Sequence, residues 1–343
     1  MKKSTKNFLL FLLLALISIC TYSILTQWSR DFSLEKLRAV LNGADPVWLF
    51  LAAVCAFGFI WFEGAAIRCS CRFFGQNCSR AQGILFSASD IYFSAITPSA
   101  SGGQPAALIM MMRRGIPAAV AAIVLLLNLV MYTAAIVLIS LICFLCHPEM
   151  LLALDPAAKV FICIGAALQL AFIALFIMCI LNDALVLKVC RWGLKLCCAL
   201  RFISDYDKQY EKLVETIRQY RECGILLRRE KTLLIKVFLL NLMQRLSVIM
   251  VAVCVFLAVG GNINGAFRAF CAQTYAVLGS NAAPIPGAVG IVDYIFIDGF
   301  ASLTHDPVML GMISRGFSFY ATFILCAALM LIEFIKRKIE KQD

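Results

Sequence analysis

Long apolar runs separated by short polar segments dominate the chain. Each long run holds enough consecutive apolar residues to cross a hydrocarbon core of roughly 30 Å as an α-helix. A membrane β-barrel is excluded, because its strands alternate in polarity and need only about 10 residues each. We expect six full spans, at residues 8–27, 47–67, 118–146, 159–181, 232–259 and 308–332.

Two further apolar stretches are interrupted by proline and glycine. The segment from Thr97 to Pro105 breaks the first, at 81–112, and the segment from Pro284 to Gly290 breaks the second, at 265–303. Neither half of either stretch is long enough to cross alone. We predict two re-entrant broken-helix hairpins, at 81–113 and 265–303. The alternative is that each stretch forms one kinked, full-length helix.

Composition supports a membrane protein. Of 343 residues, 62% are hydrophobic and 15% charged, whereas a soluble domain is about half apolar and a quarter charged. We predict an all-α polytopic membrane protein with two inverted-topology halves. Its parts are an N-terminal anchor helix at 1–27, a first membrane half at 28–181, a cytoplasmic amphipathic linker at 182–231 and a second membrane half at 232–343. The 1–27 segment differs from a signal peptide, because its apolar run is too long and no small-residue cleavage site follows.

The positive charges lie mainly on the segments that the expected topology places inside the cell. With the N-terminus inside, the internal segments hold 24 of the 31 Lys and Arg residues and the external segments hold 5. Lys and Arg gather on the cytoplasmic side of membrane proteins, so both termini are expected to be cytoplasmic. The net charge of +11 therefore gives no reason to expect nucleic-acid binding. Broken helices in corresponding positions of two inverted halves indicate a transporter-type site near the midplane.

Cysteine and histidine give no sign of a metal or a catalytic site. The sixteen cysteines are scattered mostly through apolar segments, and neither close pair, Cys69 with Cys71 or Cys197 with Cys198, has histidines or a second pair at ligand spacing. His147 and His305 lie in loops far apart in sequence. We expect no cofactor.

Ionisable residues at membrane depth are the main candidates for function, because each costs about 2.5–3.5 kcal/mol to insert. One interpretation places Arg245 and Arg315 on an anionic lipid phosphate, with Asp90 and Asp293 contacting a cationic headgroup or balancing charge. The other interpretation pairs Arg315 with Asp293, and Arg245 with Glu63 or Asp90, as structural ion pairs. For Glu63 we favour the structural role.

The predicted hairpin tips are a second candidate, because they offer backbone amides and small side chains that can receive a phosphate or a hydroxyl without charge. The residues at the first tip are Ser99, Ser101, Gly102, Gly103 and Gln104, and those at the second are Asn281, Pro284, Pro286, Gly287 and Gly290. As isolated patterns both are generic helix breakers.

Together, however, the two tips resemble a known family. The segments from Ile96 to Pro105 and from Pro284 to Asp293 are similar to the paired signatures of the lysylphosphatidylglycerol synthase transmembrane family, the flippase-like part of the multiple peptide resistance factor. Arg315 and Tyr320 in the last span also resemble residues of that family. The chain departs from the family at Asp293, where glutamate is more frequent, and at Ala288, where a second glycine is common.

The resemblance implies a bacterial inner-membrane lipid translocase that moves an anionic or aminoacylated phospholipid or glycolipid between leaflets, and with it resistance to cationic antimicrobial peptides. The alternatives are a membrane component of a phosphatidylglycerol lysyltransferase-type system and a non-catalytic scaffold. Full-length synthases carry a soluble transferase domain, whereas this chain stops eleven residues after Ile332, so we expect no aminoacyl transfer. The expected partners are membrane lipids and, in the second case, a separately encoded synthase. Lipid identity, energy source and oligomeric state stay open.

Overall fold

The structure is a computed structural model that describes residues 34–97, 100–182, 206–280 and 290–339, with the single positions 184, 187, 188, 191, 192 and 288. Every regular element in these ranges is helical, which confirms the predicted all-α class. The predicted anchor at 1–27 lies outside the described residues, as does most of the basic stretch that opens the 182–231 linker.

Five helical segments are long and apolar enough to cross a membrane within the described part of the chain. They match five of the six expected spans, and the sixth, at 8–27, falls outside that part. The five are α3 (Pro46–Phe73), α6 (Ala118–Cys146), α8 (Pro156–Leu181), α11 (Lys231–Ala258) and the run of α14 (Pro307–Arg315), a π-helical turn (Gly316–Ala321) and α15 (Thr322–Ile339).

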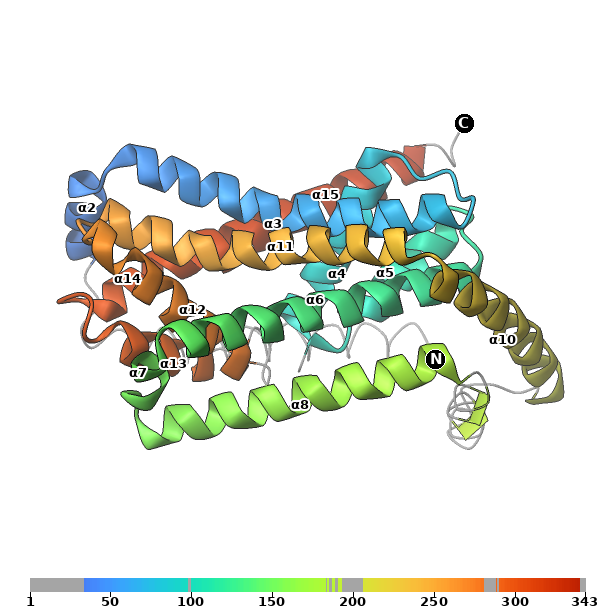
Figure 1. Ribbon diagram of the computed structural model, residues 1–343. Coiled ribbons are helices and arrows are strands. Elements are labelled where there is room, and N and C mark those ends of the chain that lie inside the picture. The colour runs from blue at the N-terminus through green and yellow to red at the C-terminus, as the bar shows by residue number, and fades with distance from the viewer. Residues whose placement is uncertain are drawn as a thin grey trace.

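An Asp-Pro dipeptide starts three of these segments, at Pro46, Pro156 and Pro307. Proline suits the first helical position, because the N–H it lacks would have no partner inside the helix. The preceding Asp45 also accepts the Val47 N–H at 2.8 Å. Its own N–H donates to the Ala258 carbonyl, so α3 begins beside the end of α11. Successive long helices therefore run in opposite directions (Figure 1).

Two pairs of shorter helices lie between the long ones. They are α4 (Arg80–Ile96) with α5 (Gly103–Arg113), and α12 (Ala266–Ser280) with α13 (Ile291–Phe300). The longest, α4, has 17 residues, or about 25 Å at 1.5 Å per residue, which is less than the hydrocarbon thickness. The members of each pair pack against each other, as in a hairpin.

The two hairpins enter the bundle from opposite ends. The first follows α3 and enters at the end where α6 and α11 begin, whereas the second follows α11 and enters at the end where α3 and α14 begin (Figure 1). A unit of long helix, hairpin and long helix thus occurs twice in opposite directions.

Small residues let α3 and α4 approach closely. A Cβ atom added to Gly83 would lie 2.5 Å from the Gly64 carbonyl oxygen, and one added to Gly64 would lie 2.8 Å from the Gly83 carbonyl carbon. Only glycine fits at this crossing, which brings the next turns of α4 against Glu63.

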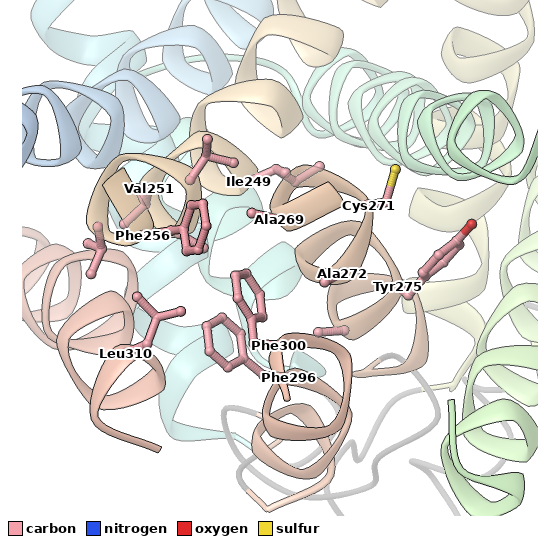
Figure 2. Packing of buried hydrophobic residues seen from close by; sticks show 14 of the residues in the cluster. Ile249, Val251, Phe256, Ala269, Cys271, Ala272, Tyr275, Phe296, Phe300 and Leu310 are labelled. Atoms are coloured by element: carbon pink, nitrogen blue, oxygen red, sulfur yellow. The ribbon is translucent and has the colours of Figure 1, made fainter. Parts of the chain in front are cut away.

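Two hydrophobic clusters fill opposite ends of the bundle. The first joins α11, α12, α13 and α14, where Phe300 packs between Phe256 and Phe296 with ring centroids 6.3 and 4.2 Å away (Figure 2). The second, at the other end, joins α3 to α6 and includes Leu227 of α10 (Tyr206–Arg229). On α6, for example, the second cluster ends at Leu127 and the first begins at Ile136.

A polar layer separates the two clusters. It consists of Glu63 on α3, Asp90 on α4, Asn128 and Tyr132 on α6, and Asn241, Gln244 and Arg245 on α11. On α6 and α11 these residues occupy the middle of the helix, so the layer lies about halfway along the bundle.

Candidate functional site

The polar layer borders a cavity of about 340 Å³, here called the central cavity. Helices α3, α4, α6, α11, α13 and α15 contribute to its wall, and so do both hairpin tips. Its lining residues are Phe59, Glu63, Asp90, Ile91, Ser94, Ala95, Ala100, Tyr132, Gln244, Arg245, Val248, Ser280, Ala288, Val292, Ser318, Phe319, Thr322 and Phe323. Residues remote in sequence thus share one chamber, whose wall combines polar and charged side chains with apolar ones.

Arg245 supplies the positive charge of the central cavity. Its guanidinium carbon lies 4.3 Å from the centroid of the Tyr132 ring, in a cation–π arrangement. Glu63 and Asp90 act on it electrostatically, but among the described residues no carboxylate oxygen lies within 4 Å of it. Its buried Nε also lacks a hydrogen-bond partner there. The described residues therefore do not contain the ion pair with Glu63 or Asp90 that the structural interpretation of Arg245 required.

Glu63 is the centre of a hydrogen-bond network. Its Oε2 accepts from the Ser87 hydroxyl at 3.0 Å and from Gln244 Nε2 at 3.1 Å, and its Oε1 accepts from Asn128 Nδ2 at 3.5 Å. Asn241 extends the network by donating to Asn128 Oδ1 at 3.0 Å. The side chain is 3% exposed. Neutral donors from α4, α6 and α11 hold this carboxyl group in the cavity wall.

Asp90 links the first hairpin to the same layer. Its Oδ1 accepts from the Ser94 hydroxyl at 3.2 Å and its Oδ2 from Gln104 Nε2 at 2.5 Å. A Cβ added to Gly103 would lie 2.0 Å from Asp90 Oδ1, so α5 can reach this carboxyl group only with glycine there. Of the two residues predicted as headgroup contacts, Gln104 donates to Asp90 and Gly103 leaves room for its carboxyl group.

Arg315 and Asp293 form a separate ion pair. Arg315 Nε lies 2.5 Å from Asp293 Oδ1, and the two side chains are 13% and 6% exposed. The Arg315 Nε–H has no hydrogen-bond partner among the described residues, so the two charges attract each other without a well-aligned hydrogen bond. Asp293 Oδ2 accepts the Gly290 N–H at 3.0 Å. Neither side chain lines the central cavity, which agrees with the structural interpretation of this pair.

The hairpin tips approach the cavity with strained backbone. Ala100 and Ala288 both have positive φ, 54° and 51°, which is uncommon for residues other than glycine, and both line the cavity. Such strain clusters at functional sites. At the first tip, Ser101 is exposed and the Gly102 N–H donates to Thr97 Oγ1 at 2.8 Å.

Five of the predicted tip residues lie outside the described residues, so the structure does not place them: Ser99, Asn281, Pro284, Pro286 and Gly287. Of the predicted charged residues, the structure brings Arg245 and Asp90 together at the cavity and places Arg315 and Asp293 beside it.

The chain as a whole matches the family model described as lysylphosphatidylglycerol synthase TM region, over residues 9–326. The chain belongs to this family. Membership links it to the modification or transport of membrane lipids. No curated protein matches the chain.

In this member of the lysylphosphatidylglycerol synthase transmembrane family, the described residues of the two signature segments include Ala100 and Ala288, which both line the central cavity. The positive φ of Ala288 explains why glycine is common there in the family, because glycine adopts this conformation without steric cost. Asp293 stands where glutamate is more frequent in the family. Its shorter side chain still accepts the Gly290 N–H and forms the ion pair with Arg315.

Sequence reasoning missed several residues of the cavity wall. Within the helices it weighed only charged side chains, and among neutral residues only those of the predicted hairpin tips, so it passed over Tyr132, Gln244, Ser94, Ser318 and Thr322. The amides had a readable signal, because Asn128 and Gln244 interrupt otherwise apolar spans. Within the described part of the chain, no group of three or more His, Cys, Asp or Glu side chains is arranged to hold a metal ion.

Proposed function

We propose that this protein is a lipid translocase of the bacterial inner membrane that moves an anionic or aminoacylated phospholipid or glycolipid between leaflets. The observation that carries the proposal is the central cavity, which lies midway along the bundle and is lined by Arg245, a cation without an ion pair among the described residues. An unpaired arginine at this depth is costly, and an anionic ligand would offset that cost.

The proposed membrane placement follows from the same geometry. If the five long helices span the bilayer, the polar layer lies near its midplane, and the two hairpins are re-entrant from opposite faces. Broken helices whose tips meet at the midplane are a common way to build a transporter site. The distribution of Lys and Arg supports a cytoplasmic position for the N-terminus, α10 and the C-terminus.

In this proposal the cavity receives the headgroup. At about 340 Å³ it is near the lower end of ligand pockets, which are about 300–1,000 Å³, so the acyl chains stay outside. Arg245 binds the phosphodiester, and the hydroxyl groups of Ser94, Ser318 and Thr322 are close enough to contact glycerol or sugar oxygens.

The acyl chains would follow the seam between α4 and α15, which pack together. Tyr92 and Phe323 stack across this seam with ring centroids 5.2 Å apart, and Phe323 also lines the cavity. This aromatic contact gives the chains an apolar border beside the polar chamber.

The test is transbilayer movement in proteoliposomes. The purified chain is reconstituted with fluorescent phosphatidylglycerol or its lysyl derivative, and dithionite reports the fraction exposed outside. We expect exchange of at least one of the two lipids well above that of protein-free liposomes.

Two other results would reject the proposal. No exchange by folded protein, together with loss of a modified lipid from cells that lack the gene, would favour a transferase component. No exchange and an unchanged lipid composition would favour a scaffold. If the proposal holds, deleting the gene should also increase sensitivity to cationic antimicrobial peptides.

A further inference from the structure

Glu63 and Asp90 form a pair of acidic side chains in the wall of the central cavity. The two residues are 3% and 6% exposed, both line the central cavity, and their carboxyl groups interact electrostatically. They lie on α3 and α4, which approach closely at Gly64 and Gly83. Every other partner that the structure gives the two groups is a neutral donor, either a hydroxyl or an amide.

Few charges face this pair. The titratable groups that act on it from the helices packed around it are Arg245 on α11, Tyr132 on α6 and Cys326 on α15. In the described part of the chain, no lysine or arginine lies within 4 Å of either carboxyl group. Two adjacent buried carboxylates repel each other strongly, and a proton shared between them relieves that repulsion.

Arg245 is thus the counter-charge both for the carboxyl pair and for an anion in the cavity. When a phosphodiester binds Arg245, the pair loses that compensation. The charge is restored if one carboxylate oxygen takes up a proton from water and becomes a carboxylic acid, while the phosphodiester stays anionic.

We propose that Glu63 and Asp90 form a proton-binding site whose occupancy is coupled to the binding of an anionic headgroup at Arg245. The proposal rests on the proposed function, because it takes the central cavity as the headgroup site. It further predicts that the affinity for the headgroup increases as the pH falls, and that about one proton is taken up per headgroup bound.

The experiment counts protons directly. The full-length chain in detergent is titrated with dihexanoyl phosphatidylglycerol by calorimetry, near neutral pH, in two buffers of different ionisation enthalpy. We expect the heats to differ by the equivalent of about one proton taken up. The uptake should fall by at least half in Glu63→Gln and Asp90→Asn, in which an amide replaces the acid, and remain in the control Glu149→Gln at an exposed carboxylate. Equal heats in both buffers would overturn the proposal.

A second measurement separates this proposal from the proposed function. Infrared spectra of the protein without lipid should contain a carboxylic acid band that disappears in Glu63→Gln or Asp90→Asn and persists in Glu149→Gln. If the band is present but the lipid does not bind, the proton site stands and the headgroup site at Arg245 fails. If the lipid binds with no band and no proton uptake, the headgroup site stands and the proton site is rejected. A protein that shows neither would reject both.

Discussion

The guanidinium group of Arg245 lies over the ring of Tyr132, with 4.3 Å between the guanidinium carbon and the ring centroid. The two residues come from the middles of α11 and α6. The ring holds the cation without neutralising it, because a π face attracts a positive charge but carries no net charge. This contact explains how an arginine can stay available to a ligand at a depth where a carboxylate partner would be expected.

The aromatic face of Tyr132 should therefore matter more than its hydroxyl group. Tyr132→Phe keeps the ring and should translocate lipid within about threefold of wild type, whereas Tyr132→Leu should be about tenfold slower, as expected for a cation–π contact of about 1–2 kcal/mol. Initial rates of fluorescent phosphatidylglycerol exchange measure both. Equal rates for the two variants would show that the ring does not position Arg245.

The pair of Arg315 and Asp293 should behave as a structural ion pair. Arg315→Gln or Asp293→Asn leaves one buried charge without its partner, which typically costs about 3–5 kcal/mol. The double variant should be more stable than the sum of the two losses predicts, because no charge is then unpaired. Unfolding free energies in detergent give the coupling. Strictly additive losses would contradict a direct interaction.

The crossing of α3 and α4 should not tolerate a side chain. In Gly83→Ala the new Cβ would lie 2.5 Å from a backbone oxygen of Gly64, so we expect a loss of about 1–3 kcal/mol from overpacking. Gly43→Ala is the matched control, since a Cβ at Gly43 meets no atom within 4 Å. Thermal unfolding should leave Gly43→Ala close to wild type. A Gly83→Ala variant as stable as the control would rule out the close approach.

Asp306 provides a pH-dependent contribution at the start of α14. Partial burial alone raises the pKa of Asp306, but the ammonium group of Lys36, 2.5 Å away, and the Met309 N–H lower that pKa overall. A carboxylate whose folded-state pKa is lowered makes its full contribution to the stability of the folded state above its unfolded pKa of about 4. This contribution is lost as the pH falls through the folded-state pKa.

Asp306→Ala should therefore lower the unfolding free energy by about 1 kcal/mol at neutral pH, mostly through the lost helix cap. The exposed ion pair adds only a few tenths of a kcal/mol. Thermal unfolding at several pH values should show the difference from wild type shrinking below about pH 4. A difference that stays constant down to acidic pH would mean that the charge of Asp306 contributes nothing.

Much of the architecture was predictable because its signals are local. Apolar length located the five described spans within a few residues of their observed ends, with two exceptions. Helix α3 continues six residues beyond the expected Ile67 to Phe73, and α15 continues seven residues beyond the expected Ile332 to Ile339. Proline and glycine marked the interruption between α4 and α5, although α5 already begins at Gly103, and the interruption between α12 and α13. The two helices that flank each interruption pack against each other.

The site was less predictable, because it depends on which residues of different helices lie at the same depth in the bundle. One of the two interpretations of the sequence paired Asp293 with Arg315, and the structure contains that pair. The sequence could not show that Arg245 would contact Tyr132 instead of a carboxylate, or that the amides of Asn128 and Gln244 would hold Glu63. Those contacts follow from the packing of α3, α6 and α11 between two apolar clusters, which is a property of the whole bundle.

The central claim is that Arg245 binds the anionic headgroup in the central cavity. The most direct test compares lipid exchange by Arg245→Gln and Lys236→Gln in the same liposomes. Both variants remove one positive charge from α11, but Lys236 is exposed and lies outside the cavity. We predict that Arg245→Gln loses at least about 90% of the wild-type rate, as expected when a charged hydrogen bond worth about 1.5–3 kcal/mol is removed, while Lys236→Gln keeps most of it. A folded Arg245→Gln protein that exchanges lipid as fast as Lys236→Gln would contradict the account.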